Sequence, residues 1–182
     1  SLRFKPEKFV QAIETRAFGI DLHWLPHAHG ALEIAHLAKA HHPDTPVIFG
    51  GYSATYFHEE LIRYPFVDYV LRGDSTEHPL EQLLQHIVAG TAPADVPNLT
   101  WKDRHGEVHV NPLTYIPQDL DHLILDYHTL VRSVVRDRDL LNYAPFSHWL
   151  EYPIMASLTV KGCTQNCTIC GGSAFAGRHL SG

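Results

Sequence analysis

Val47-Ile-Phe-Gly-Gly-Tyr-Ser-Ala-Thr55 joins a short, entirely apolar run to a glycine pair and two hydroxyl side chains. An apolar run of this length without alternation is typical of a strand that is covered on both faces of a parallel sheet. The glycine pair favours a loop that leaves the strand, and a helix is expected to follow it through Arg63. The stretch therefore predicts one buried strand-loop-helix unit of an α/β protein.

Similar units flank this one on both sides. Strands are expected at Phe18–Trp24 and Val67–Leu71, and helices at Pro6–Arg16, Ala31–His41 and Pro79–Val88. Because strands and helices alternate with short loops, the crossovers are expected to be right-handed and the sheet parallel. The predicted fold class is α/β, with a Rossmann-like, flavodoxin-like parallel sheet.

Parallel sheets of this kind bind ligands at the carboxyl ends of their strands. Those ends are His23 to Gly30, Gly50 to Thr55, and Arg72 to Glu77. Gly50 and Gly51 allow the backbone to approach a bulky ligand, and Ser53 and Thr55 offer hydroxyls to a phosphate or ribose at a helix N-terminus. The structural alternative is that the glycine pair only makes a tight turn.

The pattern changes after Pro97. Leu99–Trp101 and Val108–Val110 alternate around a turn with Gly106, which predicts an antiparallel hairpin. The elements expected next are a loop-rich connector at Pro112–Leu125, a helix capped by Asp126, and a strand at Ile154–Val160. We therefore expect an α/β domain over residues 3–92, a hairpin and connector over 93–150, and the start of another domain over 151–182.

Composition indicates a folded, soluble protein. Apolar residues make up 45% and charged residues 19% of the 182 residues, and the formal net charge is −6. No apolar run approaches the roughly 18 residues of a membrane span, and no apolar leader follows Ser1. Lys and Arg form no basic stripe for nucleic-acid phosphates. We expect a cytoplasmic protein that binds neither membrane nor nucleic acid.

All three cysteines lie within Lys161-Gly-Cys-Thr-Gln-Asn-Cys-Thr-Ile-Cys-Gly-Gly-Ser173. Thiolates of Cys163, Cys167 and Cys170 can bind three irons of a [4Fe-4S] cluster from one loop and leave the fourth iron without a protein ligand. Two alternatives stay open. A structural zinc ion needs a fourth ligand, such as His179 or a residue distant in sequence, and a disulfide leaves one cysteine over.

This cysteine spacing resembles the signature of the radical S-adenosylmethionine enzymes. The resemblance implies that Cys163, Cys167 and Cys170 hold a [4Fe-4S] cluster whose open iron binds S-adenosylmethionine, and that an electron from the cluster cleaves the sulfonium to a deoxyadenosyl radical. Ile169 departs from the pattern, because an aromatic residue commonly precedes the last cysteine. The presence of Ile169 concerns the packing against the adenine of S-adenosylmethionine and does not concern the three cysteine ligands.

Residues Phe18 to Glu77 resemble the cobalamin-binding domain that precedes one large class of these enzymes. The resemblance is carried by the helix Ala31–Lys39, Pro43-Asp44, Gly50-Gly51 with Ala54-Thr55, Glu59-Glu60, Val67–Val70, and Arg72-Gly73-Asp74 with Glu77. Within that class the chain is similar to an uncharacterised group known mainly from archaea and anaerobes. The resemblance implies cobalamin contacts at Gly50, Gly51, Ser53, Thr55, Arg72, Gly73, Asp74 and Glu77. A helix cap at Asp74 or Ser75 is the structural alternative.

Asp21-Leu-His23 is similar to the aspartate and histidine by which some cobalamin proteins provide the lower axial ligand of cobalt. Two differences separate this sequence from that motif. Pro26 stands where the motif has glycine. The motif also follows the first strand of a complete sheet, whereas Asp21 and His23 follow a strand that corresponds to the third. We therefore expect His23, with His27 and His29, to line the strand-end loop and not to bind cobalt.

The chain is expected to be the middle of a longer protein. In the resembled domain two strands and a helix precede the helix at Pro6, and the resembled barrel needs roughly 200 residues, whereas 12 residues follow Cys170. We expect the fragment to be inactive. Its open sheet edge can pair with a second copy to form a homodimer.

The leading hypothesis is a cobalamin-dependent radical enzyme that acts on a small-molecule substrate, with methyl transfer as a reaction that fits. The second is a non-catalytic module that binds a corrinoid or a nucleotide and carries a separate structural metal site. The third is a flavodoxin-like regulatory domain without a ligand. A bound corrinoid without any cluster would favour the second, and a strand-end crevice filled by side chains would favour the third.

Overall fold

The computed structural model describes residues 5–117, 127–137, 151, 160–161 and 180–181. Residues 5–117 lie in one compact unit. A second unit contains helix α6 (Tyr127–Asp137) and the antiparallel strand pair β6 (Val160–Lys161) and β7 (Leu180–Ser181). The predicted cysteine loop, most of the predicted strand at Ile154–Val160 and the predicted barrel lie outside the described residues.

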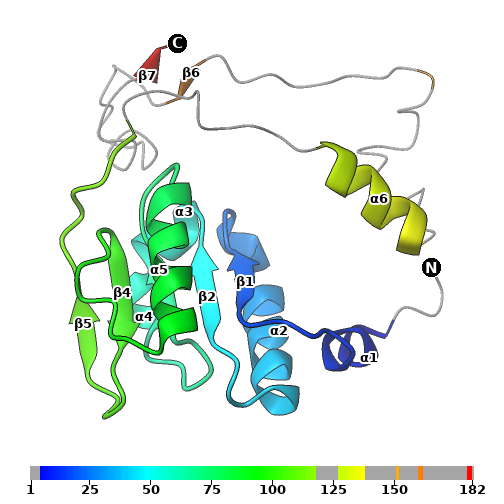
Figure 1. Ribbon diagram of the computed structural model, residues 1–182, viewed down its shortest axis with the longest axis horizontal. Coiled ribbons are helices and arrows are strands. Elements are labelled where there is room, and N and C mark those ends of the chain that lie inside the picture. Colours follow the sequence, from blue (N-terminus) through cyan, green and yellow to red (C-terminus); the bar gives the residue numbers. More distant parts are fainter. Residues whose placement is uncertain (1–4, 118–126, 138–150, 152–159, 162–179, 182) are drawn as a thin grey trace. The chain divides into compact units, whose positions relative to one another are not determined.

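A five-stranded sheet with the order β1-β2-β3-β4-β5 forms the centre of the first unit (Figure 1). Its parallel strands are β1 (Phe18–Asp21), β2 (Val47–Gly50) and β3 (Tyr69–Leu71). β4 (Leu99–Lys102) and β5 (Val108–Val110) form the predicted hairpin, and β4 pairs antiparallel with β3. The predicted α/β sheet is confirmed, and the hairpin extends it.

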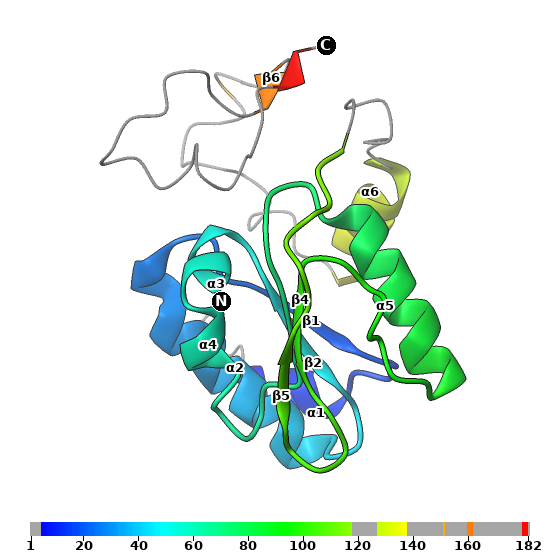
Figure 2. The ribbon, with the colours of Figure 1, turned by 90° about the vertical axis from the view of Figure 1, so that its left-hand side faces the viewer.

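Helices cover both faces of this sheet, as Figure 2 shows. On one face lie α2 (Ala28–His41), α3 (Tyr52–Tyr56) and α4 (His58–Leu61), and on the other lies α5 (Glu77–Ala89). α1 (Pro6–Gln11) packs against α2, and a short 3-10 turn, η1 (Leu25–His27), precedes α2.

The strand β2 connects the two layers of the core. Val47 and Phe49 are buried against α2 and α3, whereas Ile48 is buried on the α5 side with Leu71, Leu83 and Leu99. Successive side chains of a strand point to opposite faces, so only an unbroken apolar run can satisfy both layers. The prediction of a strand buried on both sides is confirmed.

Several predicted boundaries were wrong. The first helix ends at Gln11 and not at Arg16, and the Thr15 hydroxyl donates to the Ala17 carbonyl in a local turn that competes with helix. The first strand ends at Asp21 and not at Trp24, and the next helix begins at Ala28. The helix predicted through Arg63 is divided at Phe57 into α3 and α4. The last helix begins at Glu77, with Pro79 in its first turn.

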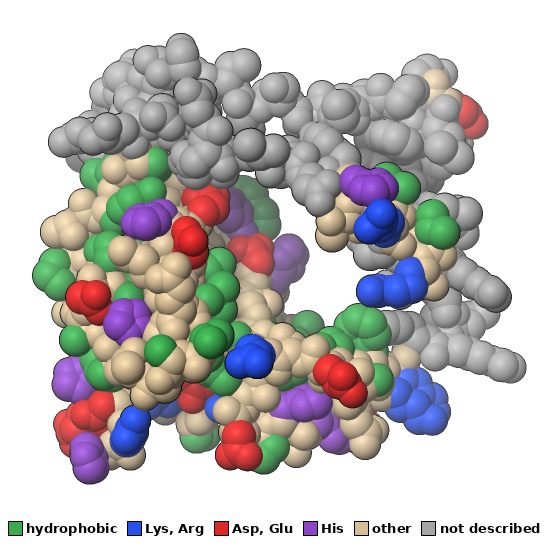
Figure 3. All heavy atoms as spheres, viewed as in Figure 1, with side chains coloured by type: hydrophobic (Ala, Val, Ile, Leu, Met, Phe, Trp, Pro, Cys, Tyr) green, Lys and Arg blue, Asp and Glu red, His purple; other side chains and the backbone are tan. Residues whose placement is uncertain are grey.

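The charged side chains of the described residues are interspersed by sign. On the face shown in Figure 3, Lys and Arg alternate with Asp and Glu, and histidines are dispersed among them. No helix among the described residues has the length and apolar character needed to span a bilayer.

Candidate functional site

Three loops meet at the carboxyl ends of the parallel strands: residues 22–27 after β1, Gly51 after β2, and residues 72–76 after β3. Because β1, β2 and β3 are parallel, their carboxyl ends lie at the same edge of the sheet. Most of the residues predicted to contact a cofactor are in these loops or in the first turn that follows them. We call this edge the strand-end crevice, a name for the three loops and not for a cavity.

Gly51 brings the first two loops into close contact. Its φ angle is +102°, and an added Cβ would lie 2.6 Å from Asp21 Oδ1, 2.8 Å from the Leu22 carbonyl carbon and 2.9 Å from His23 N. Both the backbone angle and the lack of space therefore require glycine. Gly50 differs, because an added Cβ there has nothing within 4 Å. Gly50 therefore leaves space beside the strand end, and Gly51 leaves none.

The hydroxyls of Ser53 and Thr55 bind the loops together. Ser53 Oγ donates to the His23 carbonyl over 3.0 Å, and Thr55 Oγ1 donates to the Gly51 carbonyl over 2.9 Å. The Gly73 N–H in turn donates to Thr55 Oγ1 over 2.9 Å. Since both side chains are buried, at 8% and 3% exposed, they join all three loops at one place.

Asp74 and Tyr52 connect the second and third loops. The Tyr52 hydroxyl is hydrogen-bonded to Asp74, and burial, followed by the charge of Asp74, raises the pKa of Tyr52. Gly73 has a φ angle of +111°, which lets the loop turn before Asp74. Glu77 is the first residue of α5, and the helix starts after Thr76, not after a cap at Asp74 or Ser75.

An aromatic surface that sequence reasoning missed covers the crevice. The His23 ring lies 4.4 Å from the Tyr52 ring and 5.3 Å from the Trp24 ring, measured between centroids. Trp24 is 65% exposed, and Tyr56 and Phe57 are also exposed. The signal was an aromatic residue directly after each of two strand-end loops. Flat apolar rings at a loop surface suit a large planar ligand.

His23, His27 and His29 do not form one cluster with the carboxylates. His27 lines an open hollow of about 590 Å³ between α2 and the free edge of β1, together with Asp21 and Gly30. Among the residues that the structure describes, no group of three or more His, Cys, Asp or Glu side chains is arranged to hold a metal ion. The predicted ligands Cys163, Cys167 and Cys170 lie outside those residues.

The Arg72 side chain extends to the exit of the hairpin. Its side chain is 7% exposed, and Nη2 donates to the Asn111 carbonyl. Burial lowers the pKa of Arg72, whereas the nearby Glu59 raises it. Burial also lowers the pKa of His58, and the charge of Arg72 adds to that effect. Arg72 therefore holds strands together at this edge.

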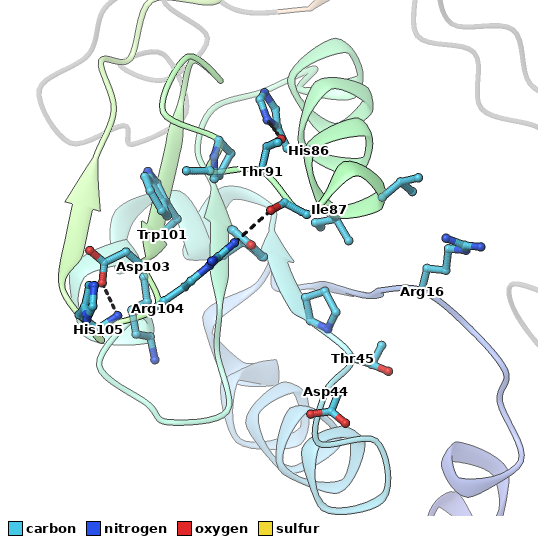
Figure 4. A pocket seen from close by; sticks show the side chains of 17 residues that line it. Arg16, Asp44, Thr45, His86, Ile87, Thr91, Trp101, Asp103, Arg104 and His105 are labelled. Carbon is cyan, nitrogen blue, oxygen red and sulfur yellow. Dashed lines mark hydrogen bonds between the residues drawn. The ribbon is translucent and has the colours of Figure 1, made fainter.

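A different hollow, of about 700 Å³, lies at the amino ends of the strands (Figure 4). Arg104 extends across it and donates from Nη2 to the Gly90 carbonyl over 3.2 Å, and Asp103 accepts from the His105 N–H over 2.8 Å. Because none of the predicted contact residues lines this hollow, and Arg104 and Asp103 already bind within the protein, we take the strand-end crevice as the candidate site.

Comparison with known proteins shows what the chain is similar to. The B12 binding domain family matches residues 2–84, which is slightly less than half of the chain. The cytidylyl-2-hydroxyethylphosphonate methyltransferase of Streptomyces wedmorensis is 24% identical, over 84% of this chain and 31% of that protein. The chain therefore spans about a third of the length of this curated relative.

Two solved structures of the radical S-adenosylmethionine methyltransferase TsrM from Kitasatospora setae share the fold. One, with tryptophan and a S-adenosylmethionine analogue bound, has a TM-score of 0.51 and 19% identity, over 60% of this chain and 21% of that one. The other, with cobalamin and a [4Fe-4S] cluster bound, has a TM-score of 0.51 and 21% identity, over 62% and 21%. The likeness concerns the arrangement of the elements.

Proposed function

We propose that the α/β unit is the corrinoid-binding part of a longer cobalamin-dependent enzyme, and that the whole protein transfers a methyl group to a small-molecule substrate in the cytoplasm. The match of the B12 binding domain to residues 2–84 is the observation that carries the proposal. The curated relative and the two structural neighbours are methyltransferases, which supports the reaction class.

The residues of the crevice fit a large flat ligand. Gly50 leaves room for a ligand to approach the end of β2, because apart from its chain neighbours no atom lies within 4 Å of its missing Cβ. The rings of Tyr52 and Trp24 offer apolar contact. Ser53 and Thr55 keep the loops in place through their hydrogen bonds. Asp74 and Glu77 offer carboxylates to the amide groups at the corrin edge.

Two cofactors would supply the reactive groups: a cobalt atom able to carry a methyl group, and a [4Fe-4S] cluster with S-adenosylmethionine on Cys163, Cys167 and Cys170. The part of the chain described by the structure contributes the binding surface for the first of them. Its role is to orient the flat ligand and to restrict water on one side of it.

Titration with hydroxocobalamin tests the corrinoid site. Gly50→Leu fills the open space at the strand end without backbone strain, since Gly50 has no positive φ angle. We expect its dissociation constant to rise about tenfold or more, a loss of roughly 1.4 kcal/mol. Gly19→Leu is the matched control, because Gly19 lies on the same sheet, also has nothing within 4 Å, and lies two residues before the last residue of its strand and not at that residue. Equal affinity of both variants and the wild type would refute this placement.

Anaerobic reconstitution with iron and sulfide tests the cluster. We expect about four irons per chain and a broad absorption band near 400 nm, both lost in Cys163→Ala. One zinc ion per chain with no iron would instead support the second hypothesis, a corrinoid-binding module with a structural metal site. In that case the hydroxocobalamin titration would still succeed, so the two parts of the proposal can fail separately.

A further inference from the structure

The third loop of the strand-end crevice bends sharply around Asp74. Gly73, the residue before it, has a φ angle of +111°. Ser75, the residue after it, has a φ angle of +57° and is buried, at 7% exposed. Left-handed backbone is uncommon for a residue with a side chain, and such strain is found most often at functional sites. The two left-handed residues place Asp74 between them in a bend of defined shape.

Tyr52, from the second loop, orients the Asp74 side chain. Its hydroxyl is hydrogen-bonded to the Asp74 carboxylate, and burial, followed by the charge of Asp74, raises the pKa of Tyr52. The phenol therefore stays protonated at neutral pH and is the donor of this bond. The Tyr52 ring is itself held by the first loop, because the His23 ring lies 4.4 Å away between centroids.

Asp74 belongs to the loops around the open end of β2. The pairing of Phe49 with Val70 puts the ends of β2 and β3 side by side. The Gly73 N–H donates to Thr55 Oγ1 over 2.9 Å, which brings the third loop against the first turn after Gly50. Asp74 is half-buried, so its side chain is accessible from the solvent. A ligand that approaches Gly50 therefore comes near this carboxylate.

The chemistry of Asp74 favours N–H donors over anions. A carboxylate has about four acceptor sites, so one that accepts from a hydroxyl can also accept from the N–H groups of a ligand. Arg72 is the only Lys or Arg in the three loops, and its guanidinium donates to the Asn111 carbonyl at the exit of the hairpin. Glu77, at the start of α5, adds a second carboxylate. An anionic group placed against Asp74 would be repelled.

We propose that Asp74, oriented by Tyr52, is a specificity-determining residue that selects corrinoids whose edge carries amide groups over corrinoids whose edge carries carboxylates. The inference rests on the proposed function, because it names the class of corrinoid that the same loops bind. An amide gives Asp74 an N–H donor, whereas a carboxylate in the same place gives it a like charge. Discrimination by this residue thus combines an attraction with a repulsion.

The test compares hydroxocobalamin with its three monocarboxylic acids, in each of which one propionamide of the corrin edge is replaced by a propionate. The dissociation constants are measured in the full chain at pH 7.5. We expect at least one of the acids to bind to the wild type at least tenfold more weakly than hydroxocobalamin does. This ratio of dissociation constants, and not the affinity itself, is the readout, because a merely structural role of Asp74 would weaken the binding of all four ligands alike.

Two substitutions of carboxylates separate a local effect from the net charge. Asp74→Asn keeps an acceptor for the Tyr52 hydroxyl and can donate an N–H to a propionate, so the ratio should fall to within threefold of one. Asp44→Asn is the matched control. It removes the same charge from an exposed residue beside the hollow at the opposite end of the sheet, and it should keep the wild-type ratio.

Tyr52→Phe tests the orienting role. It keeps the ring against His23 and removes the donor to Asp74, so we expect a ratio between those of the wild type and Asp74→Asn. Ionic strength gives a second measurement that needs no variant. Raising sodium chloride from 50 to 500 mM should lower the wild-type ratio at least threefold, because salt screens the repulsion of like charges.

The inference and the proposed function can fail separately. A wild type that binds hydroxocobalamin and all three acids within twofold of one another would overturn the inference and leave the corrinoid site standing. So would a ratio that neither Asp74→Asn nor salt reduces. If the wild type does not bind hydroxocobalamin at all, the proposed function fails, and the selectivity assigned to Asp74 fails with it.

Discussion

Gly50 and Gly51 are neighbours with opposite steric requirements. Gly51→Ala would place a Cβ within 2.6 to 2.9 Å of the first loop and leave alanine at a φ angle of +102°. We expect it to lower the free energy of unfolding by about 2–4 kcal/mol, measured by urea denaturation. Gly50→Ala, the control, should change it by less than about 0.5 kcal/mol. Equal effects of the two substitutions would contradict the assignment of close contact to Gly51.

His58 should make stability depend on pH. Burial and the charge of Arg72 lower its pKa in the folded protein, so the unfolded chain binds the proton first as the pH falls below about 6.5. The free energy of unfolding should therefore decrease from pH 7.5 to pH 5.5. The decrease should be smaller in His58→Gln. His105→Gln, an exposed control in the hairpin turn, should retain the wild-type slope, and a slope equal in all three proteins would disprove the role of His58.

The sequence predicted the location of the crevice better than the role of each residue in it. Glycine after a buried strand predicted a close approach, but only the path of the first loop shows that Gly51, and not Gly50, is the crowded position. Arg72 follows a strand as a cofactor ligand could, yet its side chain extends to Asn111. Periodicity describes neighbours along one element, whereas these contacts join residues far apart in the chain.

At the scale of the element, two glycines in helices should respond in opposite directions. Gly90 ends α5 with a left-handed φ angle of +67°, so Gly90→Ala should destabilise the protein by about 1 kcal/mol. Gly30 lies inside α2 with nothing within 4 Å of an added Cβ. Gly30→Ala should therefore stabilise it by roughly 0.5–1 kcal/mol. Thermal unfolding of both variants would test this, and a shift of the same sign in both would be inconsistent with it.

Element types were predictable, and their ends were not. The glycine stop of α5 at Gly90 followed from local backbone preference and is confirmed. The division of the third helix at Phe57 had no glycine or proline to indicate it. Near this division the Thr55 hydroxyl donates to the Gly51 carbonyl and accepts from the Gly73 N–H. The bond to Gly73 joins residues far apart in the chain, so the residue pattern of the helix alone does not predict it.

At the scale of the whole molecule, we predict self-association at the free edge of β1. Phe18 and Leu22 direct their N–H groups to β2, so Gly19 and Asp21 direct theirs to the free edge, beside the hollow against α2. We expect a concentration-dependent homodimer in sedimentation analysis. Gly19→Pro, which removes an edge donor and spares the β1–β2 pairing, should leave a monomer. A monomer in the wild type would refute the predicted homodimer.

The family match over residues 2–84 supports the prediction of a cobalamin-binding type of domain. The prediction rested on the residues of the resemblance, among them Gly50-Gly51 and Arg72-Gly73-Asp74. The three-part division of the chain and the individual cofactor contacts stay predictions, as do the cysteine ligands, which lie outside the described residues.

The hairpin of β4 and β5 brings the chain back to the end of the sheet at which β3 ends. β4 runs antiparallel to β3, and β5 runs back towards Asn111 at the crevice. The turn between β4 and β5, around Asp103 and Gly106, therefore lies at the opposite end of the sheet from the carboxyl ends of the parallel strands. A reporter peptide or an affinity tag inserted into that bend would remain remote from both the strand-end crevice and the place where the chain leaves the sheet.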